Sequence, residues 1–477
     1  MSDRVTAKQT ADTDARARPH TGGEPRLVRG LGVVDATTLV AGAVIGTGIF
    51  LVPSIVARQV GAPGLSLMVW LVCGFLATSG ALCFAELGAA IPRTGGTYAF
   101  LYRAFRTPLL PFLFGWSMFV VVLTGVMAAV ATAFATYAGF FLERVIPYGE
   151  WTHRMVAIGC ILFLTAMNCI GVRVGGKIQV AFTVLKVGAL AGLIVPGLLL
   201  GAARDGGLRP LLPAEPAVAS TFAAFGTAMI VGLFAYNGRW YITFVAGELR
   251  EPRRAIPRSI LAGMAIVLTV YVLANIAYLT VLPFDALQAS TRPAADAMQR
   301  MVGPAGAALV SAAVMLSAFG TVNAQLLGVP RIYYAMARDG LFFSAIARVH
   351  PRFRTPAAAI LAQGLWASGL ALTGSYQQII TYTAFPNYVF LNLAVVGLIV
   401  LRIREPGLHR PYRVWGYPVT PALFLLIFGW YLINSLMNTF TETMVGIVLT
   451  LFGLPFYFYW ARKRDTRTVA SYLVVRQ

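Results

Sequence analysis

Two apolar segments of this sequence are each interrupted near the middle by residues that break a helix. One contains Gly46–Gly48, and the other contains Asn237-Gly238. A break inside a membrane exposes backbone amides and carbonyls that lipid cannot satisfy, so it must face protein or a wet cavity. A helix that begins at Gly48 offers free amides to a carboxylate, and a helix that ends near Ala235 offers free carbonyls to an ammonium group. Two facing breaks predict a zwitterion site; the alternative is that these glycines serve close helix packing.

Two basic residues also lie inside apolar segments. Lys186 falls at the centre of residues 177–201, where a charge costs about 2.5–3.5 kcal/mol, so we expect it to face the interior and contact carbonyls. The alternative is a lysine that snorkels to an interface. Arg239 follows the second break. It either reaches the cavity and pairs with an acidic substrate group or Glu86, or it caps the free carbonyls of the break; the sequence leaves both open.

The remaining reactive residues do not form a catalytic or metal-binding pattern. The four cysteines lie in apolar segments, and the four histidines fall in expected loops or the N-terminal tail. We therefore predict no metal, no cofactor and no enzyme activity. The basic residues lie in short loops between apolar runs, which argues against nucleic acid as a partner of this chain of net charge +20. A channel would need a ring of charges or a carbonyl filter, which one pair of breaks does not supply.

The elements that position these residues are about twelve transmembrane helices. Hydrophobic residues make up 58% of the chain and charged residues only 12%, and apolar runs long enough to cross a bilayer recur along the chain. Two of the runs, 109–141 and 302–337, are too long for one straight crossing. Most of the 38 Lys and Arg fall on the side of the N-terminus, which predicts a multi-pass protein of the cell inner (plasma) membrane with both termini in the cytoplasm.

The two breaks lie five spans apart, which divides the first ten spans into two halves of opposite orientation. This spacing is typical of an inverted repeat with broken helices in matching positions. The expected organisation is a disordered tail (1–30), a first repeat (31–205), a second repeat (215–405), two extra helices (406–462) and a C-terminal tail (463–477).

Four stretches in chain order resemble motifs of the amino acid–polyamine–organocation (APC) transporter superfamily, most like its L-type amino acid transporter branch. The first resembles the G-x-x-I-G-[ST]-G-I-F motif and the second a P-x-[ST]-G-G-x-Y loop, and the other two resemble span 6 with its following loop and the loop after span 8. They are Gly42–Phe50, Pro92–Tyr98, Phe234–Gly238 with Val245–Pro252, and Arg331–Gly340. One departure is Arg239, because L-type members usually have tryptophan directly after the span 6 glycine and this chain has Trp240 one place later.

The resemblance implies an all-α, five-plus-five inverted-repeat (LeuT-like) fold with broken helices 1 and 6, alternating access and amino acid substrates. It implies that Ile45, Gly46, Thr47, Gly48 and Ile49 bind the carboxylate, that Phe234, Ala235, Tyr236, Asn237 and Gly238 form the ammonium end, and that Lys186 replaces a coupling ion. Arg239 is expected to tune substrate selectivity.

The function expected from this resemblance is sodium-independent exchange of neutral amino acids. The alternatives are a proton-coupled symporter and, in a different class, a polytopic membrane enzyme. The expected partners are an amino acid and the lipid bilayer. We expect function without an accessory subunit, because no external cysteine is available to link one by a disulfide.

Overall fold

The computed structural model describes residues 32–92, 96–170, 176–201, 218–243, 249–338, 340–348, 350 and 355–463. Nearly all of these residues are helical, which confirms the predicted all-α membrane fold. Eight helical units are long and apolar enough to cross a bilayer. They are α4 (Pro63–Ala90), α6 to α7 (Leu109–Leu142), α8 (Glu150–Cys169), α11 (Pro252–Val281), α14 (Pro304–Gly328), α17 (Tyr376–Arg404), α18 (Val419–Asn438) and α19 with α20 (Phe440–Arg462).

A ninth span consists of two helices joined at a break. Three further helices are apolar, but their described apolar stretches are shorter than those of the eight spans. The broken span is α2 (Val33–Val44) followed by α3 (Gly48–Val60), with a bend of 42° between them. The shorter helices are α9 (Gly176–Gly201), α10 (Val218–Ala235) and α16 (Ala357–Thr373). These segments coincide in order with the twelve runs expected from the sequence.

The two runs that were too long for one straight crossing, 109–141 and 302–337, have different structures. Residues 109–142 form one continuous unit, α6 (Leu109–Ser117), η1 (Met118–Val122) and α7 (Leu123–Leu142), in which η1 is a π-helical turn. The π turn frees backbone carbonyls, and neighbouring side chains satisfy them. The Trp366 indole donates to the Val120 carbonyl at 2.7 Å, and the Tyr333 hydroxyl donates to that of Met118 at 3.3 Å.

The second overlong run ends its membrane helix at Gly328 and continues as α15 (Pro330–Arg338). Short helices outside the spans were not expected from the sequence. They are α5 (Thr97–Phe105), α12 (Phe284–Ala289), α13 (Pro293–Val302) and η3 (Ser344–Ala347). Of these, α12 packs on α3, where the Gln288 amide donates to the Ala57 carbonyl at 3.0 Å.

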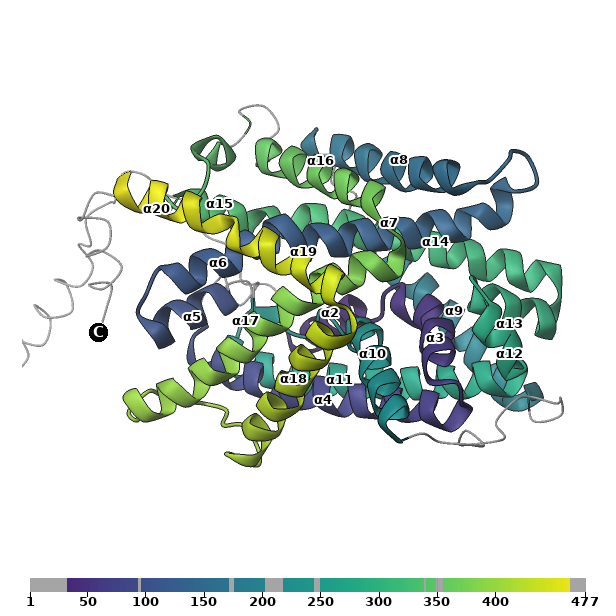
Figure 1. The fold of residues 1–477 in the computed structure, drawn as a ribbon, viewed down its shortest axis with the longest axis horizontal. Helices are drawn as coiled ribbons and strands as arrows, with labels where there is room; N and C mark the ends of the chain where they lie inside the picture. Colours follow the sequence, from purple (N-terminus) through teal and green to yellow (C-terminus); the bar gives the residue numbers. More distant parts are fainter. Residues whose placement is uncertain are drawn as a thin grey trace, which may run out of the picture.

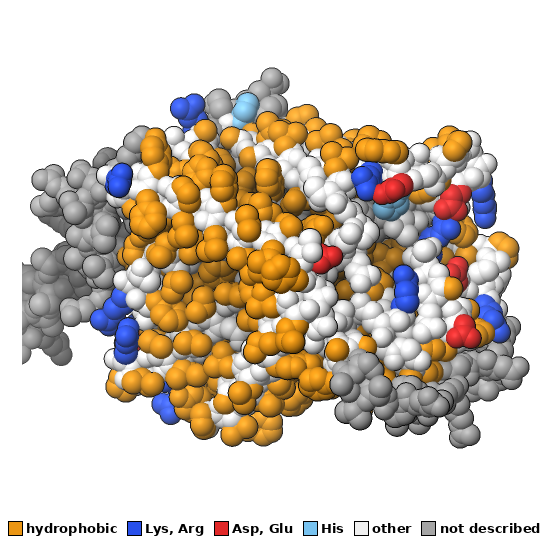
Figure 2. All heavy atoms as spheres, viewed as in Figure 1, with side chains coloured by type: hydrophobic (Ala, Val, Ile, Leu, Met, Phe, Trp, Pro, Cys, Tyr) orange, Lys and Arg blue, Asp and Glu red, His pale blue; other side chains and the backbone are white. Residues whose placement is uncertain are grey.

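The spans form one bundle in which α8, α16, α7 and α14 pack side by side along one flank and the broken span lies among α4, α10 and α11 (Figure 1). On the face drawn in Figure 2, exposed hydrophobic side chains form a broad band. In this view Lys and Arg line its left edge, and mixed acidic and basic side chains lie at its right. An apolar band between two charged edges is the surface that a lipid bilayer requires.

Candidate functional site

The first break separates α2 from α3. Residues Ile45–Thr47 are not helical, and α3 begins at Gly48. The first amides of a helix have no partner within it, so the start of α3 presents N–H groups and the positive end of a helix dipole. Gly46 is half-buried, whereas Ile45, Thr47, Gly48 and Ile49 are buried.

The second break follows α10, which ends at Ala235. The chain then turns through residues 236–240, and Gly238 has a φ of +100°, which favours glycine. The Asn237 side-chain oxygen accepts the Gly238 amide at 3.0 Å and holds this turn. The end of α10 therefore presents carbonyls and the negative end of a dipole.

The fold brings the two breaks into contact. A Cβ placed on Gly48 would lie 3.0 Å from both Cα and Cβ of Ala235. A Cβ on Gly238 would lie 2.8 Å from the carbonyl oxygen of Ala43. The positive start of α3 thus touches the negative end of α10, which is the arrangement that a zwitterion needs.

One aromatic pair borders this junction. The half-buried Phe234 ring meets the Tyr376 ring edge to face at 6.2 Å between centroids. Because Tyr376 begins α17, the contact joins the end of α10 to a third element.

Two tyrosines of α11 hold the breaks, and sequence reasoning missed both. The Tyr271 hydroxyl lies 2.8 Å from the Val44 carbonyl oxygen and 3.0 Å from that of Ala235. It has one proton, so it donates to one of these carbonyls at a time. The Tyr278 hydroxyl donates to the Ile49 carbonyl at 3.2 Å. The sequence did contain a signal for them: Tyr271 and Tyr278 are seven residues apart, so their hydroxyl groups lie on the same face of an otherwise apolar span.

Lys186 lies against the first break. Its ammonium is buried and donates to the carbonyl oxygens of Ile45 at 3.1 Å and Gly42 at 3.3 Å. These are carbonyls that the end of α2 leaves without helical partners. The lysine therefore places a fixed positive charge at the break rather than at a membrane interface.

Arg239 is fully buried beside the second break. One guanidinium nitrogen, Nη1, donates to the Tyr236 carbonyl at 3.1 Å, and the guanidinium lies over the Trp240 ring at 4.6 Å. This is the carbonyl-capping arrangement that the sequence left open.

Glu86, which the sequence left open as a partner of Arg239, pairs with other residues. Its carboxylate accepts Arg402 Nε at 2.9 Å and the Val414 amide at 2.6 Å, and Arg410 Nε lies 3.4 Å away. Glu86 thus joins the end of α4 to α17 and to the loop before α18, as a buried ion pair rather than a substrate ligand.

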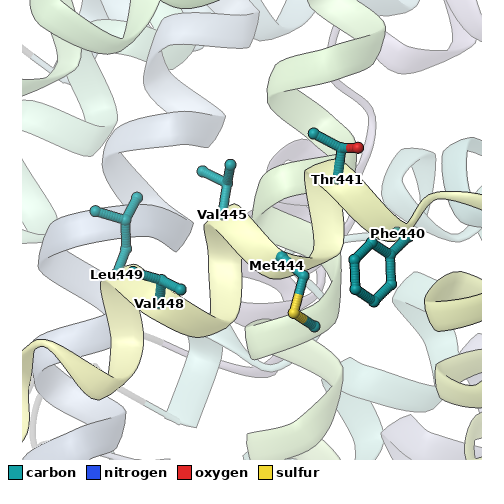
Figure 3. A pocket seen from close by; sticks show the side chains of 6 residues that line it. All are labelled: Phe440, Thr441, Met444, Val445, Val448 and Leu449. Carbon is teal, nitrogen blue, oxygen red and sulfur yellow. The ribbon is translucent and has the colours of Figure 1, made fainter.

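A hollow on the surface of the bundle is lined by none of these site residues. A shallow groove of about 430 Å³ runs along the outer side of α19 (Phe440–Leu451) (Figure 3). It is lined by Phe440, Thr441, Met444, Val445, Val448 and Leu449. With no charged lining residue and a place on the apolar surface, the groove suits lipid chains and not an amino acid.

The sequence comparisons decide the family. The profile described as amino acid permease matches residues 31–474. The chain belongs to the amino acid permease family. This permease is 34% identical to the large neutral amino acids transporter small subunit 2 of Mus musculus, over 95% of the chain and 86% of the relative. It is also similar to the cystine/glutamate transporter of Homo sapiens, with 31% identity over 94% and 89% of the two chains. The Asc-type amino acid transporter 1 of Mus musculus is 32% identical over 92% and 82%.

These findings confirm the resemblance to the L-type branch and the assignment as an amino acid transporter of the membrane rather than an enzyme. Of the motif residues that carried the resemblance, 93–95, 245–248 and 339 lie outside the described residues, as do both expected tails over residues 1–30 and 464–477.

The expectation that the permease functions without an accessory subunit is wrong. The large neutral amino acids transporter of Mus musculus is named a small subunit, so a further subunit belongs to that transporter. The missing external cysteine misled the inference, because a subunit can also be held by noncovalent packing of exposed apolar and polar surface.

Proposed function

We propose that the permease is a sodium-independent exchanger of neutral amino acids that works by alternating access. The observation that carries this proposal is the pair of hydrogen bonds from Lys186 Nζ to the Gly42 and Ile45 carbonyls. Unwound carbonyls of a broken helix coordinate the coupling cation in carriers of this architecture. A tethered ammonium occupies those carbonyls permanently, so no sodium ion is needed there.

The amino acid binds where the two breaks touch. Amides of Ile45–Ile49 bind its carboxylate, and carbonyls of Phe234–Tyr236 bind its ammonium group, with Asn237 and Gly238 shaping the turn. The contact between Gly48 and Ala235 supports this assignment, because it sets helix ends of opposite polarity side by side. The Ala235 and Tyr236 carbonyls already accept Tyr271 and Arg239, yet each has a second lone pair for the substrate.

Both termini lie in the cytoplasm, and two inverted repeats, 31–205 and 215–405, rock around the site. The loop charges support this orientation, as does the row of Lys and Arg along one edge of the apolar band (Figure 2). The names of the relatives also support assembly with a second, larger subunit. A complex larger than the permease alone, purified from its native membrane, tests that assembly.

Proton-coupled symport is the second candidate, and the buried Lys186 favours it as a group that can release and regain a proton. One experiment separates the two. Radiolabelled leucine uptake is measured into proteoliposomes with and without internal amino acid, sodium and a pH gradient. Uptake that requires internal amino acid supports exchange, whereas uptake into empty vesicles driven by inward protons supports symport. Sodium-driven uptake contradicts both.

A further inference from the structure

Arg239 has a charge that no described carboxylate balances. Its side chain is fully buried, and Nη1 alone has a hydrogen-bond partner, the Tyr236 carbonyl. Nε and Nη2 are buried without one. Among the ion pairs of the described residues none includes Arg239, whereas the carboxylate of Glu86 is shared by Arg402 and Arg410.

Two buried tyrosine hydroxyls share this lack of partners. Tyr388 of α17 and Tyr431 of α18 are at most 2% exposed, and neither hydroxyl proton has a hydrogen-bond acceptor of standard geometry. Their rings meet edge to face at 4.9 Å. The Tyr388 oxygen faces the Arg239 guanidinium, with which it interacts by charge and by a side-chain hydrogen bond outside strict geometry, so what the hydroxyl lacks is an acceptor for its own proton.

These groups gather at one place in the bundle. The helix before Arg239, α10, packs against both α17 and α18, which also pack on each other. The cluster is built from the turn after α10 and from α17 and α18, and through the Tyr236 carbonyl it adjoins the junction proposed for the amino acid.

The chemistry of the cluster is that of an anion site. A buried cation without a counter-charge is strongly unfavourable, and a buried hydroxyl without a partner loses the hydrogen bonds that it makes to water in the unfolded chain. The free groups are the three N–H donors of Nε and Nη2 and the two tyrosine O–H donors. A water molecule would satisfy some of these donors and leave the charge unbalanced. A small anion satisfies the donors and the charge together.

We propose that a small monovalent anion of the halide class binds among Arg239, Tyr388 and Tyr431. The anion is a fixed part of the folded permease, and this proposal does not depend on which amino acid is carried or on how its transport is coupled.

The test is thermal unfolding of the purified permease without amino acid, in chloride or in gluconate at equal ionic strength. A ligand of the native state raises Tm with its concentration, so we expect a saturable rise of a few degrees in chloride and in bromide but not in the larger gluconate. Arg239→Gln should abolish the response. Tyr388→Phe and Tyr431→Phe each remove one donor and should raise the half-saturating chloride concentration about fivefold.

The matched control is Tyr333→Phe, which removes the hydroxyl of another buried tyrosine, one bonded to the Met118 carbonyl, and should keep the wild-type chloride response. If Arg239→Gln does not fold, the two tyrosine variants still decide the question, because they retain the guanidinium. Equal unfolding curves in chloride and gluconate overturn the proposal, as does a chloride response that survives in all three variants.

The same thermal unfolding experiment is repeated with glutamate in place of chloride. If glutamate replaces the chloride effect and loses it in Arg239→Gln, the occupant is a substrate carboxylate and the halide proposal fails. Because these readouts need no transport, a chloride response in a protein that fails the exchange assay would overturn the proposed function alone.

Discussion

Gly48, at the start of α3, faces Ala235, at the end of α10, so closely that a side chain on Gly48 would have no room, although the two residues are far apart in the sequence. A Cβ on Gly48 would sit 3.0 Å from Ala235 Cα, a distance tighter than ordinary side-chain contacts. The neighbour is backbone at the end of α10, so it cannot turn away as a flexible side chain would. The contact fixes how closely the two helix ends of opposite polarity approach.

Gly48→Val should therefore abolish amino acid uptake while the protein still folds into the membrane. The added methyl groups force α3 and α10 apart and cover the amides expected to bind the carboxylate. Initial uptake rates in proteoliposomes, with the amount of folded protein measured by size-exclusion chromatography, provide the check. Gly369→Val is the matched control, because a Cβ on this exposed glycine of α16 has no neighbour within 4 Å. Wild-type uptake in Gly48→Val would contradict the proposed site.

Gly238→Ala should impair both stability and uptake. At a φ of +100° a side chain costs about 1–3 kcal/mol, and its Cβ would also press on the Ala43 carbonyl oxygen at 2.8 Å. The control is Gly61→Ala, which has a φ of +67° but nothing within 4 Å of the new Cβ. We expect a clearly larger fall in Tm for Gly238→Ala. Equal falls would mean that the approach to Ala43 is unimportant.

Transport should not depend on sodium, because Lys186 already occupies the carbonyls of the first break. The initial rate of uptake in sodium should equal that in choline at constant ionic strength. Lys186→Met should lose most of the uptake, since the Gly42 and Ile45 carbonyls are left unpaired in a buried site. A steep sodium dependence in the wild type would argue against the proposed mechanism.

Glu86→Gln should destabilise the permease far more than a change at an exposed acid. Removing one partner of a buried ion pair costs about 3–5 kcal/mol, and here two arginines lose their counter-charge. Glu150→Gln is the control, because Glu150 is largely exposed and its pair with Arg154 should contribute about 0–1 kcal/mol. The measurement is thermal unfolding in detergent. Similar Tm values for the two variants would show that the Glu86 cluster is unimportant for stability.

Lysine and arginine should be poor substrates of the wild type. The guanidinium of Arg239 lies one residue from the second break, and its charge repels a cationic side chain there when no bound halide balances it, so the prediction applies to the permease in gluconate. A competition panel of unlabelled amino acids against labelled leucine gives the ranking. Arg239→Trp should move the ranking toward large neutral amino acids. Strong inhibition of the wild type by lysine would refute the selectivity role, and an unchanged ranking in a less stable variant would leave Arg239 as a carbonyl cap.

The sequence by itself determined the membrane class, the order of the spans, the positions of both breaks and the depth of Lys186. These are local properties of the sequence. No partner segment is needed to identify an apolar run long enough to cross lipid, a glycine pair within it or a charge at its centre. Only the tertiary structure decided that Tyr271 reaches carbonyls of both breaks, that Glu86 pairs with Arg402 rather than Arg239, and that Arg239 turns into the bundle. In a bilayer both the lipid-facing and the protein-facing sides of a helix are largely apolar, so apart from a few polar residues such as Tyr271 the sequence does not reveal which way a span is rotated. That rotation sets the contacts between residues hundreds of positions apart, and it follows from packing alone.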